Sequence, residues 1–146
     1  MTNTELRLVF PALDIDSIEV RVYADSSFAN NPDHSSQLGY VVFVVDKHDK
    51  CALVAWCSKT SRRVTRSVLA AELFALSAGY DIGYTTRHTL STLLQRTVTL
   101  RLYTDSQGLW DAMTSLSPLA ERRLAIAIAG LRQAYRTGDL RHLCRI

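Results

Sequence analysis

Two short stretches of this sequence are near copies of each other, and each contains an aspartate. Residues 20–26 read Val-Arg-Val-Tyr-Ala-Asp-Ser, and residues 100–106 read Leu-Arg-Leu-Tyr-Thr-Asp-Ser. Each alternates apolar and polar side chains, which predicts a half-buried strand, and then reaches an Asp-Ser pair typical of a turn or helix cap. If the two strands are neighbours, parallel and in matching register, Asp25 and Asp105 stand about 5 Å apart. Such carboxylates repel each other unless a proton or a cation lies between them, so the repeat indicates a metal site.

A third acid lies in the helix that is predicted between the two copies. Leu69, Leu73, Leu76 and Tyr80 are spaced four, three and four residues apart and form one helical stripe. Glu72 falls about 40° from Leu76, on the edge of that stripe. A buried acid is costly unless a positive group meets it. A salt bridge to an arginine would meet this need, but the aspartate pair favours a third metal ligand.

The elements that must position these acids follow from the patterning. Apolar runs predict five strands, at residues 18–24, 38–45, 51–57, 97–103 and 140–146. Residues 46–50 have the length of a hairpin connection. The first three strands are therefore expected to form an antiparallel meander with the second strand in its middle.

Helices are predicted to follow the meander. The first is capped by Thr65 or Ser67, and residues 81–96, which contain Gly83, are expected to form a turn and a short helix. Another helix runs from Ser106 to about Met113. The last opens at Ser117 and Pro118, ends at Gly138 and carries the stripe Leu124, Ile128, Leu131 and Tyr135.

This order of elements predicts where the acids meet. A helix between the meander and the strand at 97–103 is a right-handed crossover, which lets that strand lie parallel to the strand at 18–24. The carboxyl ends of these two strands form a topological switch point, where open α/β sheets place their sites. Asp25 and Asp105 both lie there, and Glu72 can project toward it from the crossover helix.

Composition is that of one globular domain. The chain has 146 residues, of which 47% are apolar, and no stretch of about 18 apolar residues that would span a membrane. Residues 1–17 are interpreted as a tail or the end of a preceding segment, and residues 18–146 as the domain. The first residues lack the features of a signal peptide. An odd number of cysteines without metal-ligand spacing predicts core thiols of an intracellular protein: Cys51, Cys57 and Cys144.

Charge is distributed unevenly along the chain. The net charge is −4 over residues 1–57 and +7 over residues 58–146, and 14 of the 17 basic residues are arginine. Arginine suits bidentate phosphate contacts better than lysine does. The basic part of the chain therefore favours a polyanionic partner, although solvated arginine surfaces are common.

Several segments resemble a ribonuclease H domain, and more narrowly that domain in Ty1/copia-like retrotransposon polyproteins, a fungal one being expected. Three of them carry the acids, in the order that the family has, with the expected elements between them. The resemblance covers residues 18–146 and rests on residues 23–27, 66–73 and 103–106, supported by residues 37–40, 61–67 and 123–135.

The resemblance implies a function and a fold. The fold would be ribonuclease H-like, an α/β fold with a five-stranded mixed sheet of order 3-2-1-4-5 and helices packed on it. The implied activity is hydrolysis of the RNA strand of an RNA–DNA hybrid with two magnesium ions (Mg²⁺), for which Mn²⁺ can substitute. By position, Asp25 would bridge both ions, Glu72 would hold one and Asp105 the other. Hard cations select such carboxylates, and a two-metal site activates water and stabilises the leaving oxygen.

The resemblance also implies partners. The duplex would be recognised through its shape, 2′-hydroxyls and phosphates, and a reverse transcriptase domain of the same polyprotein would precede this one. The expected location is the cytoplasm, the nucleus or a virus-like particle. Candidate nucleic-acid contacts are Ser26, Ser27, Asn30, Arg62, Arg63, Arg66 and Gln107.

One departure from the family pattern matters. Such domains carry a fourth acid on a helix after the fifth strand, and this sequence ends at Ile146 before such a helix. Asp139 precedes the strand, and Asp111 lies about 120° from Asp105 around a helix, so neither substitutes. The sequence is then truncated, completed by a neighbouring chain or inactive. Apolar surface left by the missing helix would favour a homodimer.

The departure keeps a second function open. The alternative to an active nuclease is a catalytically impaired ribonuclease H-like scaffold or tether that still binds nucleic acid. An ATP-binding member of the same broad fold is disfavoured because no glycine-rich phosphate loop follows the strands. An integrase-type enzyme is disfavoured by the pairing of the helix glutamate with the Tyr-Thr-Asp-Ser turn.

Overall fold

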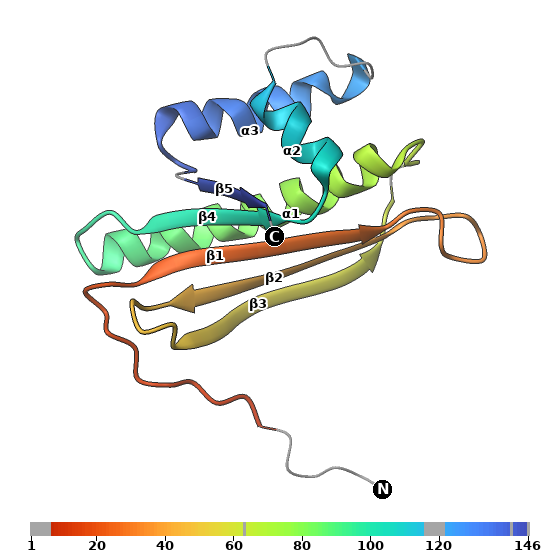
Figure 1. The fold of residues 1–146 in the computed structure, drawn as a ribbon. Coiled ribbons are helices and arrows are strands. Elements are labelled where there is room, and N and C mark those ends of the chain that lie inside the picture. The colour runs from red at the N-terminus through yellow and green to blue at the C-terminus, as the bar shows by residue number, and fades with distance from the viewer. Residues whose placement is uncertain (1–6, 63, 116–121, 141, 146) are drawn as a thin grey trace, which may run out of the picture.

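The computed structural model describes residues 7–62, 64–115, 122–140 and 142–145. Its centre is a single five-stranded sheet (Figure 1). The strands are β1 (Glu19–Ser27), β2 (Gln37–Val45), β3 (Cys51–Thr60), β4 (Thr99–Thr104) and β5 (His142–Arg145). Their order across the sheet is β3-β2-β1-β4-β5, which confirms the predicted mixed sheet.

Strand directions and register also agree with the prediction. β2 is antiparallel to β1 and to β3, so the hairpin meander is present with β2 in its middle. β4 is parallel to β1, and Tyr23 pairs with Tyr103 while Val22 pairs with Leu102. The two copies of the repeated phrase therefore lie side by side in matching register.

The first strand is longer than predicted. β1 continues through Asp25 to Ser27, because its far end is still paired with β2, where Asp25 lies opposite Gly39. β4 stops at Thr104, one residue before Asp105. The two aspartates occupy equivalent positions in the sequence repeat, but Asp25 lies within a paired strand and Asp105 lies just past the end of one.

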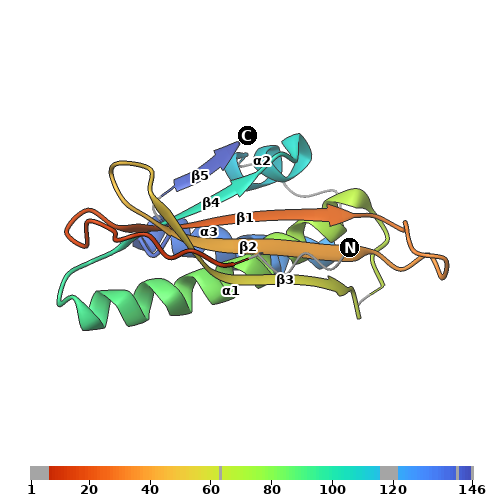
Figure 2. The same ribbon diagram turned by 90° about the horizontal axis from the view of Figure 1, so that it is seen from below.

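Helices cover one face of the sheet, and the opposite face has no helix of the described residues on it (Figure 2). They are α1 (Val68–Leu93), α2 (Gln107–Thr114) and α3 (Ala125–Thr137), with a short 3₁₀ turn, η1 (Arg122–Leu124), before α3. α1 packs on β1, β2 and β4. Its stripe supplies Leu73 and Leu76 to a core completed by Val20, Val22, Val42, Leu100 and Leu102.

The predicted break after Tyr80 is wrong, because α1 is one helix of 26 residues that passes through Gly83. A Cβ at Gly83 would lie 2.5 Å from Cγ2 of Val22, and a Cβ at Gly79 would lie 2.8 Å from Cγ1 of the same valine. The glycines therefore allow the helix to approach β1 closely. They are packing residues rather than helix breakers.

Other details of the helices and cysteines differ from expectation. Tyr135 is 54% exposed, because the neighbouring Ala134 takes the buried position in the last turns of α3, whereas Ile128 and Leu131 are buried as predicted. Gly138 ends α3 in the left-handed conformation with φ of 81°. Cys51 is exposed, since it begins the edge strand β3, so it is not a core thiol.

Two predictions concern positions outside the described residues. They are the start of the last helix at Ser117 and Pro118, and Arg63 as a nucleic-acid contact. Across the described residues, none of the helices combines the length and the apolar composition that a membrane crossing needs.

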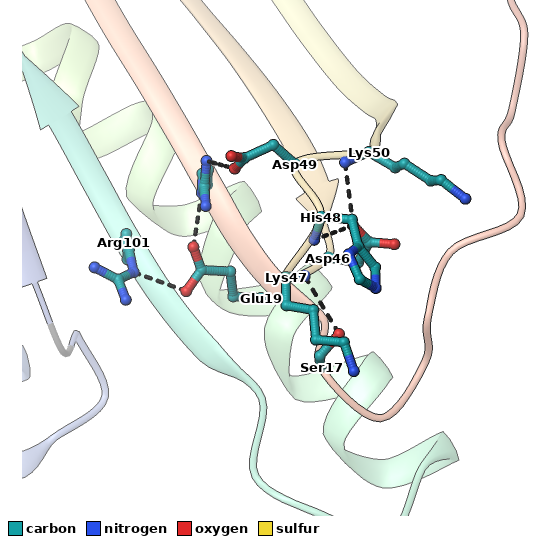
Figure 3. A network of polar contacts seen from close by, with 9 residues as sticks. Ser17, Glu19, Asp46, Lys47, His48, Asp49, Lys50 and Arg101 are labelled. Carbon is teal, nitrogen blue, oxygen red and sulfur yellow. Dashed lines mark hydrogen bonds and ion pairs between the residues drawn. The ribbon is translucent and has the colours of Figure 1, made fainter.

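A polar network holds the start of β1, at the end of the sheet away from Asp25 (Figure 3). Glu19 accepts hydrogen bonds of 2.7 Å from Nε of both Arg21 and Arg101, which ties β1 to β4. Asp46 is 2% exposed and closes the β2–β3 hairpin. Its carboxylate accepts the backbone N–H groups of Asp14, His48 and Lys50.

Candidate metal centre

Asp25 is presented by a strand. It follows Tyr23 by two residues and therefore lies on the same, helix-free face of β1, next to the last pair that joins β1 to β4. Its side chain is exposed, and its Oδ1 accepts the backbone N–H of Ser26 at 2.7 Å. This bond fixes the carboxyl group beside the carboxyl end of β1.

Asp105 is presented by the turn between β4 and α2. Ser106 caps α2, because its Oγ accepts the backbone N–H of Leu109 at 3.2 Å. The backbone N–H of Ser106 donates to Oγ1 of Thr104 at 3.1 Å. The Asp-Ser pair that predicted a cap is therefore a helix cap, and it leaves the carboxyl group of Asp105 exposed at the strand end.

Glu72 is presented by the first turns of α1. Ser67, rather than Thr65, is the N-cap, and its Oγ accepts the backbone N–H of Ala70 at 3.1 Å. The Glu72 side chain is directed toward the end of β1, where its Oε1 accepts a hydrogen bond of 2.8 Å from Oγ of Ser26. Glu72 is only 7% exposed, so its position at the edge of the apolar stripe makes it a buried acid.

The three acids converge. One carboxylate oxygen from each of Asp25, Glu72 and Asp105 lies within 4.8 Å of those of the other two. Burial raises the pKa of Glu72 above its usual value. The hydrogen bond from Ser26 works against this rise, and the charges of Asp25 and Asp105 add to it.

This donor set fits a hard divalent cation. Three carboxylates on three different elements supply oxygen ligands, which Mg²⁺ and Mn²⁺ prefer. Within the described part of the chain, Glu72 forms no ion pair with an arginine or lysine, in contrast to Glu19 and Asp139. The salt bridge that was the alternative account of Glu72 is thus missing from these residues, and its burial is left without a positive partner.

The whole chain was compared with known proteins. No protein-family model matches it, and no curated protein sequence matches it either. Among solved structures it is similar to RNase H1 of the archaeon Halobacterium salinarum, with 20% sequence identity, a TM-score of 0.57, and coverage of 88% of this chain and 85% of that one.

Two further structures extend the likeness. LC11-RNase H1, solved in complex with an RNA/DNA hybrid, has 15% identity, a TM-score of 0.59, and coverage of 88% of this chain and 83% of that one. A foamy viral protease-reverse transcriptase in complex with dsDNA has 14% identity, a TM-score of 0.59, and coverage of 90% and 83%. The chain has the ribonuclease H-like fold.

In this ribonuclease H-like fold, some predicted nucleic-acid contacts surround the acids. Ser26 and Ser27 end β1, and Gln107 begins α2, two residues after Asp105. The Gln107 side chain donates to Oδ1 of Asp111 at 2.6 Å. Asp111 is engaged there, and it is not a member of the acid cluster among the described residues.

The other predicted contacts lie on the connections. Asn30 is exposed in the β1–β2 loop, and Arg66 is exposed directly before the N-cap of α1. Arg62 lines a pocket of about 690 Å³ together with Lys59 of β3 and residues of α1 such as Ser77, and none of the three clustered acids lines this pocket. The described candidate contacts therefore divide into three that adjoin the acids in sequence and three on the connections, namely Asn30, Arg62 and Arg66.

Sequence reasoning missed two features of this site in the ribonuclease H-like fold. Ser26 was interpreted as part of a turn or cap and as a nucleic-acid contact, whereas its hydroxyl group donates to Glu72. The rings of Tyr23 and Tyr103 stack with a centroid separation of 4.5 Å and an interplanar angle of 13°. The repeat itself contained the signal for the second feature, because it places a tyrosine two residues before each aspartate.

Proposed function

We propose that this chain is a metal-dependent endonuclease that hydrolyses the RNA strand of RNA–DNA hybrids. The observation that carries the proposal is the convergence of Asp25, Glu72 and Asp105, within 4.8 Å of one another, at the switch point of the ribonuclease H-like sheet. Three carboxyl groups at such short distances repel one another in an ion-free site. Burial raises the pKa of Glu72, and the charges of Asp25 and Asp105 add to this rise. A functional cation would offset this repulsion.

The proposed centre takes two Mg²⁺ ions, for which Mn²⁺ can substitute. Asp25 would contact both ions, Glu72 would hold one and Asp105 the other. When bound, the ions supply an activated water and a positive charge for the leaving oxygen. The chain's own contribution is orientation: Ser26 directs the Glu72 carboxyl group, and the cap of α2 directs that of Asp105.

The proposed substrate follows from the chemistry around the acids. The hydroxyl group of Ser27 and the amide group of Gln107 can donate to phosphate and ribose oxygens. The hydroxyl oxygen of Ser26, whose proton is donated to Glu72, can accept a hydrogen bond from a ribose 2′-hydroxyl. Arg66 supplies an exposed positive charge near the start of α1. Asn30, Arg62 and Arg63 complete the proposed set of contacts. LC11-RNase H1, which has the same fold, was solved with an RNA/DNA hybrid, and this supports the choice of substrate.

The proposed biological setting is reverse transcription of a Ty1/copia-like retroelement. Residues 18–146 would be the nuclease domain, with residues 1–17 leading to it from a reverse transcriptase domain of the same polyprotein. The similarity to a foamy viral protease-reverse transcriptase supports a reverse transcriptase partner. Homodimer formation stays a separate prediction, which analytical ultracentrifugation measures.

Cleavage of a labelled hybrid tests the proposed activity. The RNA strand of an end-labelled RNA–DNA hybrid is expected to be cut with Mg²⁺ or Mn²⁺ and to stay intact with EDTA. The Asp105→Asn variant is expected to lose cleavage, while Asp111→Asn, which changes an aspartate outside the cluster, is expected to keep it. An intact hybrid with wild-type protein and either metal would contradict the proposal.

The second function is a scaffold of the same fold that binds nucleic acid without cutting it. The observation that favours it is that three acids converge among the described residues, where the family resemblance implies four. Hybrid binding without cleavage, unchanged by Asp105→Asn, would select this function over the nuclease.

A further inference from the structure

Two tyrosines form the last contact between β1 and β4 before the acids. Tyr23 pairs with Tyr103 across the parallel strands, and their rings stack at 4.5 Å with 13° between the ring planes. Each tyrosine stands two residues before an acid. Tyr23 and Asp25 share a face of β1, and Asp105 directly follows the end of β4, the strand of Tyr103. The stack is therefore one row away from the carboxyl groups.

The stack lies where the backbone stops joining the two strands. The pairing of β1 with β4 ends at Tyr23 and Tyr103. Beyond this point Asp25 is held by its pairing with Gly39 of β2, whereas Asp105 lies past the end of β4. No rung of the β1–β4 ladder fixes the distance between the two aspartates.

Electrostatic repulsion acts on this unpaired end. The carboxyl groups of Asp25 and Asp105 are both exposed and lie within 4.8 Å of each other, with Glu72 beside them. Two like charges at this distance push the strand ends apart until a cation binds. An aromatic pair is attractive beyond the burial of its area, so the stack opposes that separation.

Tyr23 is supported from its other side. The ring of Phe43, on β2, meets it edge-on, with centroids 6.1 Å apart and 79° between the planes. The Tyr23 ring is thus held between β2 and β4. This leaves Tyr103 as the ring that brings the end of β4 to β1.

We infer that Tyr23 and Tyr103 are positioning residues of the metal centre. Their stacked rings set the spacing of Asp25 and Asp105 before a cation binds, so the site needs little rearrangement to accept one. The ring faces carry this role and the hydroxyl groups do not. The inference rests on the proposed function, since it assigns the stack to the proposed cation site.

Metal affinity, measured without substrate, tests the inference. Isothermal titration of Mn²⁺ into the purified chain compares wild type with Tyr103→Leu, which keeps an apolar side chain but removes the ring. The attraction within a stacked aromatic pair corresponds to about 2- to 10-fold in an equilibrium constant, so a loss of affinity of several-fold is expected for Tyr103→Leu. Tyr103→Phe keeps the ring and is expected to bind Mn²⁺ as wild type does.

Tyr84→Leu is the control for packing. It removes a ring from another aromatic pair, Tyr80 and Tyr84 of α1, which contacts neither Tyr23 nor Tyr103. It is expected to lower the melting temperature without changing the affinity for Mn²⁺. If Tyr103→Leu does not fold, as judged by circular dichroism, Tyr103→Met takes its place, with the same loss of affinity expected.

The outcomes separate the inference from the function on which it rests. If wild type binds Mn²⁺ and Tyr103→Leu binds it equally well, the stack is packing alone and the inference is wrong while the metal centre stands. If Tyr103→Phe binds as weakly as Tyr103→Leu, the hydroxyl group matters and the inference is again wrong. If wild type binds no Mn²⁺, the proposed metal centre fails and the inference fails with it.

Discussion

Ser26 Oγ donates a 2.8 Å hydrogen bond to Oε1 of Glu72, a residue 46 positions further along the chain. The bond joins the end of β1 to the first turns of α1 at the acid cluster. It opposes the effect of burial on Glu72, because a donor to the carboxylate favours the charged form and lowers its pKa. Ser26 thus keeps a buried acid closer to the ionised state that binds a cation.

Ser26→Ala is expected to weaken metal binding. Without the hydroxyl donor, the pKa of Glu72 rises further, so a larger fraction of the carboxyl group is protonated at a given pH. Because only the ionised carboxyl group binds a cation, the loss of Mn²⁺ affinity is expected to be largest at acidic pH, where Glu72 is most protonated. Titration of Mn²⁺ at several pH values should show the midpoint of binding moving to higher pH. An unchanged midpoint would contradict the role given to Ser26.

Asp105→Asn is expected to stabilise the metal-free protein. It removes one of three converging negative charges, so repulsion within the cluster falls. The melting temperature in EDTA should rise by about 2–4 °C, which corresponds to a gain of about 1 kcal/mol in the free energy of unfolding for a chain of this size. Asp111→Asn, outside the cluster, should leave it unchanged.

The same variants respond differently to magnesium. A cation that binds only the folded state raises the melting temperature of wild type and of Asp111→Asn in proportion to the logarithm of its concentration. Asp105→Asn should lose most of this rise. If magnesium stabilised all three proteins equally, the cation would bind elsewhere.

Glu72 is expected to make the metal-free protein less stable as pH rises. Its pKa is raised in the folded state, chiefly by burial, from an ordinary value of 4.5. Its contribution to stability is therefore complete below pH 4.5 and is lost as pH rises through the raised value. Urea unfolding in EDTA should show this decline for wild type and a flatter profile for Glu72→Gln.

Other acids titrate in a lower window. Side-chain hydrogen bonds lower their pKa values from 3.8, so they contribute stability above that pH and lose it on acidification: Asp14, Asp33 and Asp139. The effect of Glu72 on the free energy of unfolding is therefore measured above pH 4.5, where these three aspartates stay ionised. A wild-type profile as flat as that of Glu72→Gln above this pH would contradict the assignment.

Much of the site could be predicted because its information is local or repeated. The crossover helix predicted that the two strands are parallel neighbours, and the duplicated phrase predicted that Asp25 and Asp105 meet if the strands are in matching register, as they are. The spacing of Leu73 and Leu76 predicted the buried side of α1 and the unusual position of Glu72. Short-range patterns were sufficient for these features.

The features that could not be predicted depend on contacts between distant segments. Gly83 was interpreted as a helix break from its intrinsic preference, while its actual environment is Val22 on the neighbouring strand. Tyr135 continues an apolar stripe in sequence, but the neighbouring Ala134 takes the buried position on α3 and Tyr135 is exposed. The bond from Ser26 to Glu72 spans 46 residues, and no local pattern indicates it.

Gly83→Ala is expected to destabilise the protein even though alanine favours helices. The new Cβ would lie 2.5 Å from Cγ2 of Val22 and 3.0 Å from Cδ1 of Leu100, and both side chains are fully buried with little room to move. Overpacking of this kind costs about 1–3 kcal/mol, which exceeds the gain in helix propensity of about 1 kcal/mol.

Gly130→Ala is the matched control, because it lies within α3 with no atom within 4 Å of the new Cβ. It should raise the free energy of unfolding by about 0.5–1 kcal/mol. Adding Val22→Ala to Gly83→Ala should cost less than the two single changes together, because the smaller side chain removes the clash. Urea unfolding of wild type, Gly83→Ala, Val22→Ala and the double variant measures this coupling. Strictly additive costs would mean that α1 does not depend on Gly83 to reach β1.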